Sequence, residues 1–104
     1  MAQAKQTAKD FLEALGKSDW AAAAEFYPPY APKGRGFDDV FTEKLKNYLG
    51  GLEVVSLGTP YKDASYPGVF VPYEIRFKNG ETKNFRLAVR QDNPEQKWYW
   101  DGGL

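Results

Sequence analysis

Carboxylates and tyrosines are the side chains that could carry acid–base chemistry in this chain, because the sequence contains no histidine and no cysteine. Imidazole relays, thiolate nucleophiles and thiolate zinc sites are therefore excluded. Enolisation or dehydration at neutral pH would need a carboxylate desolvated beside the substrate. The acid we select for that role is Glu25, which lies two residues before Tyr27. The competing interpretation of Glu25 is an ordinary solvated glutamate near a helix end.

A pair of acidic residues, Asp38 and Asp39, could indicate metal binding or acid–base work. Both lie in the expected first turn of a helix, where carboxylates are stabilised by the positive end of the helix dipole. Helix capping explains the pair without further chemistry. We therefore predict no metal site and no cofactor.

The elements that must position these groups begin with helices. Apolar residues recur at helical spacing over 3–15, and a second helix, rich in alanine, is expected over 20–27 before Pro28. A loop rich in proline and glycine follows, and a third helical pattern runs over 37–49 until Gly50 and Gly51 end it.

Strand patterns replace the helical ones after Gly51, over 52–57, 69–77, 85–91 and 97–100. Helices followed by strands indicate the α+β class, with helices packed on a four-stranded antiparallel sheet. Pro72 cannot donate to a sheet ladder, so its strand must be an edge or contain a bulge there, and a bulge would curve the sheet into a cone. We expect residues 1–104 to form one domain.

The register of the second and third strands follows from the need to place both apolar faces on one side of the sheet. A two-residue turn at 79–80 would put them on opposite sides, whereas a three-residue loop at 78–80 pairs Tyr73 with Phe85. We therefore predict the three-residue loop, with Gly80 in the left-handed conformation.

The next turn is predicted to span 92–95, which sets Val89 opposite Trp98. In that register both Trp98 and Trp100 face the core, and Arg86 lies beside Asp101 as a cross-strand ion pair. The outer face then carries an apolar row rimmed by charge, which is typical of an interface. We predict a homodimer through this row, formed by Phe70, Pro72, Ala88 and Tyr99.

The opening and the end of the chain resemble the nuclear transport factor 2-like superfamily, which has a cystatin-like fold and includes ketosteroid isomerases and polyketide cyclases. The opening pattern is Ala-x-x-Phe-Leu-x-Ala-Leu-x-x-x-Asp-Trp-x-Ala-Ala from Ala8, and the closing run is Lys97 to Gly102. The resemblance implies a cone-shaped cavity and, in catalytic members, an aspartate base with a tyrosine oxyanion hole or a histidine dyad. No carboxylate falls on the expected inner sheet face, so no catalytic acid carries over.

Two functions follow from these patterns. The preferred one is a small non-catalytic binding or assembly module, whose aromatic cavity takes an apolar ligand with Tyr73 as its polar handle. The alternative is a small isomerase, dehydratase or cyclase of the ketosteroid-isomerase type that acts on a hydrophobic ring through Glu25 and Tyr73. Whether side chains fill the cavity stays open. The cavity-lining candidates are Tyr27, Tyr30, Tyr73, Phe85, Trp98 and Trp100.

Charge and hydropathy restrict the classes of partner that this chain is expected to bind. Lysine plus arginine equal aspartate plus glutamate at 14 each, and this balance disfavours nucleic acid as the main partner. No apolar run approaches the roughly 20 residues of a membrane-spanning helix. We expect a soluble protein, either cytoplasmic or the mature part of an exported bacterial protein.

Overall fold

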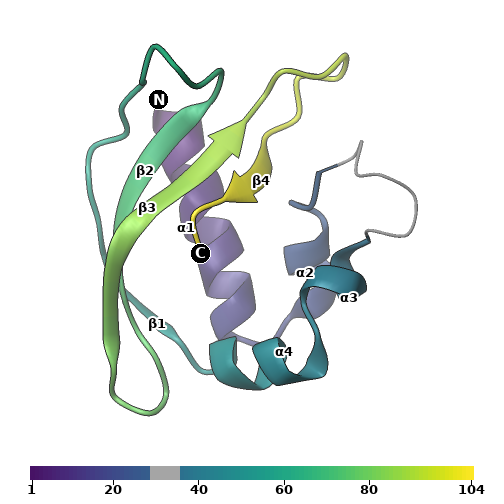
Figure 1. Cartoon of the computed structure of the whole chain (residues 1–104), viewed down its shortest axis with the longest axis vertical. Helices are drawn as coiled ribbons and strands as arrows, with labels where there is room; N and C mark the ends of the chain where they lie inside the picture. Colours follow the sequence, from purple (N-terminus) through teal and green to yellow (C-terminus); the bar gives the residue numbers. More distant parts are fainter. Residues whose placement is uncertain (29–35) are drawn as a thin grey trace.

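The computed structural model describes residues 1–28 and 36–104, in which helices precede a four-stranded antiparallel sheet (Figure 1). The strands follow one another in the sheet in chain order. This arrangement confirms the α+β class with N-terminal helices on an antiparallel sheet. The elements are α1 (Ala2–Gly16), α2 (Trp20–Ala24), α3 (Phe37–Val40), α4 (Glu43–Leu49), β1 (Glu53–Leu57), β2 (Val69–Arg76), β3 (Thr82–Arg90) and β4 (Tyr99–Gly102).

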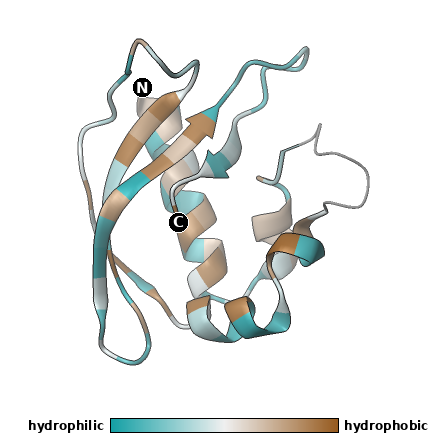
Figure 2. Cartoon of the chain, viewed as in Figure 1, coloured by the Kyte–Doolittle hydropathy of each residue, from teal (hydrophilic) through white to brown (hydrophobic). Residues whose placement is uncertain are grey.

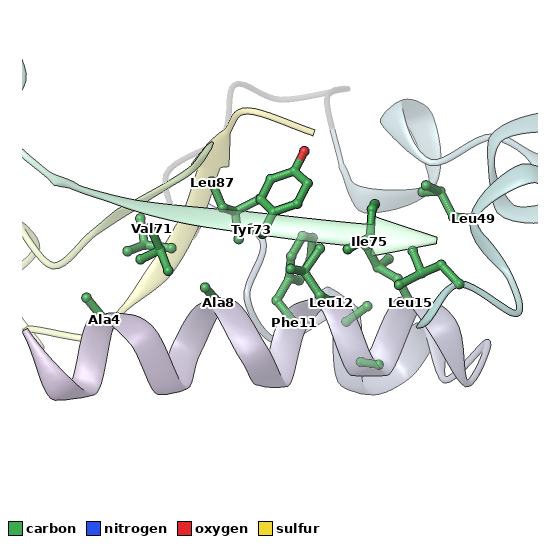
Figure 3. Close-up of a cluster of buried hydrophobic side chains, with 14 of the residues drawn as sticks. Ala4, Ala8, Phe11, Leu12, Leu15, Leu49, Val71, Tyr73, Ile75 and Leu87 are labelled. Carbon is green, nitrogen blue, oxygen red and sulfur yellow. The ribbon is translucent and has the colours of Figure 1, made fainter. Parts of the chain in front are cut away.

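The core forms where α1 lies along the inner face of β2 and β3 (Figure 3). Residues spaced three or four apart on α1, including Ala8, Phe11 and Leu15, are fully buried on the side that faces the sheet. Alternate residues of β2, among them Val71 and Ile75, meet them. Helical and strand periodicities therefore bury one stripe of α1 against one face of the sheet.

The hairpin between β2 and β3 has the predicted register, with Tyr73 opposite Phe85. The backbone N–H of Phe77 donates to the Glu81 carbonyl at 2.7 Å, and that of Gly80 donates to the Phe77 carbonyl at 2.9 Å. Gly80 has a φ of +91°, the left-handed conformation that closes a three-residue loop. Figure 2 shows this turn as hydrophilic, whereas the far halves of both strands carry apolar residues.

Pro72 lies where β1 ends. Its carbonyl accepts from the backbone N–H of Gly58 at 2.8 Å, just past the last β1 residue, Leu57. The nitrogen and carbonyl of one residue point to the same side of an antiparallel strand, so the position that lacks an N–H faces Gly58 and not β3. β2 lies between β1 and β3 and pairs with β3 without a bulge at Pro72, so the predicted edge or bulge in this strand is wrong, and the register shift lies in β1 between Val54 and Ser56.

The predicted register of β3 and β4 is wrong by two residues, since Val89 pairs with Trp100. The turn is longer than four residues because the Asn93 side chain bonds twice to Lys97. Its Nδ2 donates to the Lys97 carbonyl at 2.7 Å, and its Oδ1 accepts from the Lys97 N–H at 3.0 Å. A shift by two preserves the face, so Trp100 still lies on the Val89 side, whereas Trp98 falls outside β4.

The predicted ion pair between Arg86 and Asp101 is also wrong, as the register shift requires. Asp101 instead accepts from the Tyr66 hydroxyl at 2.6 Å and lies 3.6 Å from Arg90. The Arg86 guanidinium donates to the Tyr61 hydroxyl at 3.1 Å and lies over the adjacent ring of Phe70 at 4.3 Å.

The predicted apolar row on the outer face is covered by the chain itself. Phe70 pairs with Ala88 as expected, but Tyr99 pairs with Arg90, so the row is not continuous. The segment between β1 and β2 lies over it, with the Tyr66 ring stacked on Phe70 at 4.7 Å. Ala88 and Tyr99 are each only 7% exposed. The expectation that this row is exposed is therefore wrong, and the homodimer stays a prediction.

The helix predicted over 37–49 is two helices, α3 and α4, separated at Phe41 and Thr42. Phe41 leaves the helical conformation at φ −91° and ψ 77°. The Thr42 hydroxyl then accepts from the backbone N–H of Leu45 at 3.3 Å, so a new helix begins there. In the described part of the chain, no helix has the length and apolar character needed to cross a membrane.

Candidate functional site

A cavity of about 230 Å³ lies between α3, α4, the hairpin end of the sheet and the C-terminal residues. Its wall is mostly apolar and aromatic, as is usual for small-molecule sites. The residues that line it are Val40, Phe41, Leu45, Tyr48, Leu49, Phe77, Lys83, Trp100 and Leu104.

The break between α3 and α4 gives the cavity its helical wall. Leu45 and Leu49 lie one turn apart on α4, which has Thr42 as its N-cap, and both line the cavity. Phe41, at the break, is buried, and the Tyr48 ring lies 4.5 Å from Phe77 at the end of β2. A continuous helix would have placed this apolar stripe differently with respect to the sheet.

Trp100 forms the inner wall of the cavity. Its ring stacks on Phe11 at 5.5 Å and lies 5.3 Å from Phe41, and its backbone N–H donates to the Phe26 carbonyl at 2.7 Å. The indole Nε1 is buried and has no hydrogen-bond partner within residues 1–28 and 36–104. A buried donor left unpaired costs about 1–3 kcal/mol, so this N–H lowers the stability of the fold.

Lys83 supplies the charge in the cavity wall. It lies on the inner face of β3, opposite the fully buried Ile75, and is half-buried. Its Nζ is 5.7 Å from the centre of the Phe85 ring, which is 51% exposed on the same face. This part of the inner face is therefore the open end of the concave sheet.

Tyr73 is held by the chain's own C-terminal residues. Its hydroxyl donates to the Gly103 carbonyl at 2.7 Å, and burial raises its pKa to about 12. The hydroxyl that was expected to serve as the polar handle for a ligand therefore already has a backbone partner. Tyr73 is absent from the cavity wall described above, although its ring is buried.

Glu25 lies outside the cavity wall as well. Its side chain is 75% exposed and its Oε2 lies 3.7 Å from the Nζ of Lys97. No acidic side chain is present in the wall of this cavity among the described residues. The carboxylate and the tyrosine chosen for acid–base work thus both lie elsewhere than in the cavity wall.

Capping accounts for the acidic pair at the start of α3, as predicted. The Asp39 carboxylate accepts from the backbone N–H of Gly36 at 2.8 Å, and Asp38 forms an ion pair with Lys46 at 3.0 Å. Among the residues that the structure describes, no three acidic side chains gather closely enough to hold a metal ion.

The other residues predicted to line the cavity lie outside its wall or outside the described residues. Trp98 lies at the opposite end of α1, where its Nε1 donates to the Gln3 side chain at 3.3 Å. The Tyr27 ring lies 6.3 Å from that of Trp100, behind the cavity wall. Phe85 is on the predicted inner face but is half-exposed beside the wall. Tyr30 lies outside the described residues.

A second polar cluster lies on the outer face around Arg90. Its Nε donates to Asp92 at 2.8 Å, and this bond is the main reason why the pKa of Asp92 falls to about 2. Burial, followed by the hydrogen bond to Asp101, raises the pKa of Tyr66. Tyr99 also donates to Asp92, at 3.2 Å. Because these groups form hydrogen bonds and ion pairs with one another, the cluster holds together β3, β4 and the segment between β1 and β2.

Comparison with known proteins finds no matching family model, no matching curated protein and no matching solved structure. The geometry of the cavity is therefore the basis for inferring a function.

Proposed function

We propose that this chain is a small non-catalytic binding module whose cavity takes an apolar ligand of about two fused rings. The observation that carries the proposal is a cavity whose wall is apolar and aromatic, with Phe41, Phe77 and Trp100 among its lining residues. An engineered protein cavity of about 150 Å³ binds benzene. The cavity in this chain, at about 230 Å³, has room for a larger ring system.

Binding without catalysis is the better supported function. The described wall offers hydrogen-bond donors but no Asp or Glu side chain to act as a base, and the Tyr73 hydroxyl is already bonded to Gly103. The alternative isomerase, dehydratase or cyclase would need Glu25 to leave its exposed ion pair and lose water beside the substrate. No contact in the described structure favours that step.

Membership of the nuclear transport factor 2-like superfamily is part of the same proposal. It is supported by helices at the start of the chain, a concave antiparallel sheet and a tryptophan in the last strand. A cavity between that sheet and the helices is what the resemblance implies.

Binding of 2-naphthalenemethanol, a neutral two-ring alcohol, tests the proposal by isothermal titration calorimetry. It has about 12 heavy atoms, and at roughly 0.4 kcal/mol per atom its Kd would be about 0.3 mM. Leu45→Trp fills the cavity from α4 and is expected to weaken binding at least tenfold. Asn47→Trp adds the same ring at an exposed position of α4 outside the cavity wall and is expected to bind as the wild type does.

Two results would contradict the proposal. Equal binding by the wild type and Leu45→Trp would place the ligand elsewhere on the molecule. An absence of heat with the wild type, up to several times the expected Kd, would mean that the cavity does not take such ligands. Urea denaturation of each variant shows whether it is folded, so that lost binding is assigned to the filled cavity.

A further inference from the structure

The charge of Lys83 indicates what kind of apolar ligand the cavity would take. Within the described part of the chain, Lys83 is the only residue of the cavity wall that has a charged side chain. Other cations near the core have counter-ions: Lys46 pairs with Asp38, and Arg90 pairs with Asp92 and Asp101. None of the ion pairs among residues 1–28 and 36–104 includes Lys83.

The position of Lys83 makes that unpaired charge significant. It occupies an inner-face position of β3, in the same alternation as the buried Leu87 and Val89, where an apolar side chain would complete the stripe. Lys83 is partly buried, and no acidic side chain in the described wall neutralises its charge. An anionic group on a ligand would neutralise it, and this bond would be charge-assisted.

Lys83 and Trp100 lie at opposite ends of the cavity. Trp100 pairs with Val89, six residues along β3 from Lys83, and at roughly 3.4 Å per residue the two backbone positions are about 20 Å apart. Both side chains nevertheless reach the same cavity. Phe85, exposed beside Lys83, marks the open end of the concave sheet, whereas Trp100 is partly buried and packs on Phe11 and Phe41.

We propose that the ligand is a monoanionic, mostly apolar carboxylic acid. Its carboxylate pairs with the Nζ of Lys83 at the open end, and its apolar body lies between α4 and Phe77 and extends toward Trp100. This inference rests on the proposed binding function and adds the charge of the ligand to it.

Two ligands with the same ring system distinguish the effect of the ligand's charge on affinity from the effect of burying its apolar rings. 2-Naphthoate and 2-naphthalenemethanol differ only at the head group, and both are titrated calorimetrically into the wild type at low ionic strength. We expect the acid to bind about tenfold tighter, which corresponds to one charge-assisted bond of about 1.4 kcal/mol. Lys83→Met is expected to remove that advantage and to leave binding of the alcohol within about twofold of wild type.

Two variants control for charge and position. Lys83→Arg keeps a cation at the open end and is expected to retain most of the preference for the acid. Lys44→Met removes an exposed lysine of α4 that lies outside the cavity wall, so the preference is expected to stay as in the wild type. Far-UV circular dichroism and urea denaturation show that each variant is folded.

The outcomes distinguish this inference from the function on which it rests. If the wild type binds the alcohol as tightly as the acid, the acid inference is overturned and the apolar binding function stands. If Lys83→Met weakens both ligands equally, Lys83 only shapes the wall, and the inference is again overturned. If neither ligand binds the wild type, the proposed function fails and the acid inference fails with it.

Discussion

Leu87 and Arg86 are adjacent in β3 and point to opposite faces, so they test the assignment of the core directly. Leu87 is 0% exposed between β2 and α1, whereas Arg86 is exposed on the outer face. Leu87→Ala removes about three methylene equivalents, worth roughly 2.4 kcal/mol of transfer free energy, and leaves a cavity that raises the loss to about 2–5 kcal/mol. This is a large part of the stability of a domain of this size.

Arg86→Ala is the matched variant, and its expected loss is smaller. It removes an exposed hydrogen bond to Tyr61 and a cation–π contact with Phe70, together about 1 kcal/mol. Urea denaturation followed by tryptophan fluorescence measures both free energies of unfolding. If Arg86→Ala costs more than Leu87→Ala, the faces of β3 are assigned the wrong way round.

Three further predictions concern the C-terminal residues, the outer face and assembly. Gly103→Ala should destabilise the fold by about 1–3 kcal/mol, because φ is +89° and the new Cβ would lie 2.1 Å from the Arg86 carbonyl oxygen. Spectrophotometric titration should then show the pKa of Tyr73 falling from about 12 toward its ordinary value, because displaced C-terminal residues would expose a hydroxyl whose pKa is raised by burial. The pKa of Asp92 in the folded protein, about 2, lies below its unfolded value near 4, so stability from its pairing with Arg90 is complete above about pH 4 and declines as pH falls to 2. Urea midpoints across this range should fall less steeply for Asp92→Asn, and an equal slope would contradict this reasoning. Sedimentation equilibrium at tens of micromolar should show a dimer, and a monomer at that concentration would refute the predicted assembly.

Local spacing was enough to predict the core and one hairpin. The stripe on α1 follows from helical periodicity, and the loop at 78–80 follows from the need to bury both apolar faces together. Both depend on neighbours in the sequence, and the structure confirms both. Trp100 keeps the predicted face of the sheet, because a register error of two residues leaves its face unchanged.

Long-range and side-chain effects account for what the sequence did not reveal. The Asn93 side chain lengthens the last turn through bonds to Lys97, which periodicity does not describe. Coverage of Phe70 by the segment before β2 is a tertiary contact without a local signal. Lys83 was missed because the strand was expected to begin at Phe85, two residues later than its position on the cavity wall.

The indole N–H signals of the tryptophans provide the most direct test that the cavity binds a ligand. Trp100 lines the cavity, and its Nε1 has no hydrogen-bond partner among the described residues, whereas the Nε1 of Trp98 bonds to Gln3 at the far end of α1. In a ¹H–¹⁵N correlation spectrum titrated with 2-naphthoate, the Trp100 indole signal should shift progressively to saturation while that of Trp98 stays in place. A shift of Trp98 without Trp100, or no shift of either at saturating ligand, would contradict binding in this cavity.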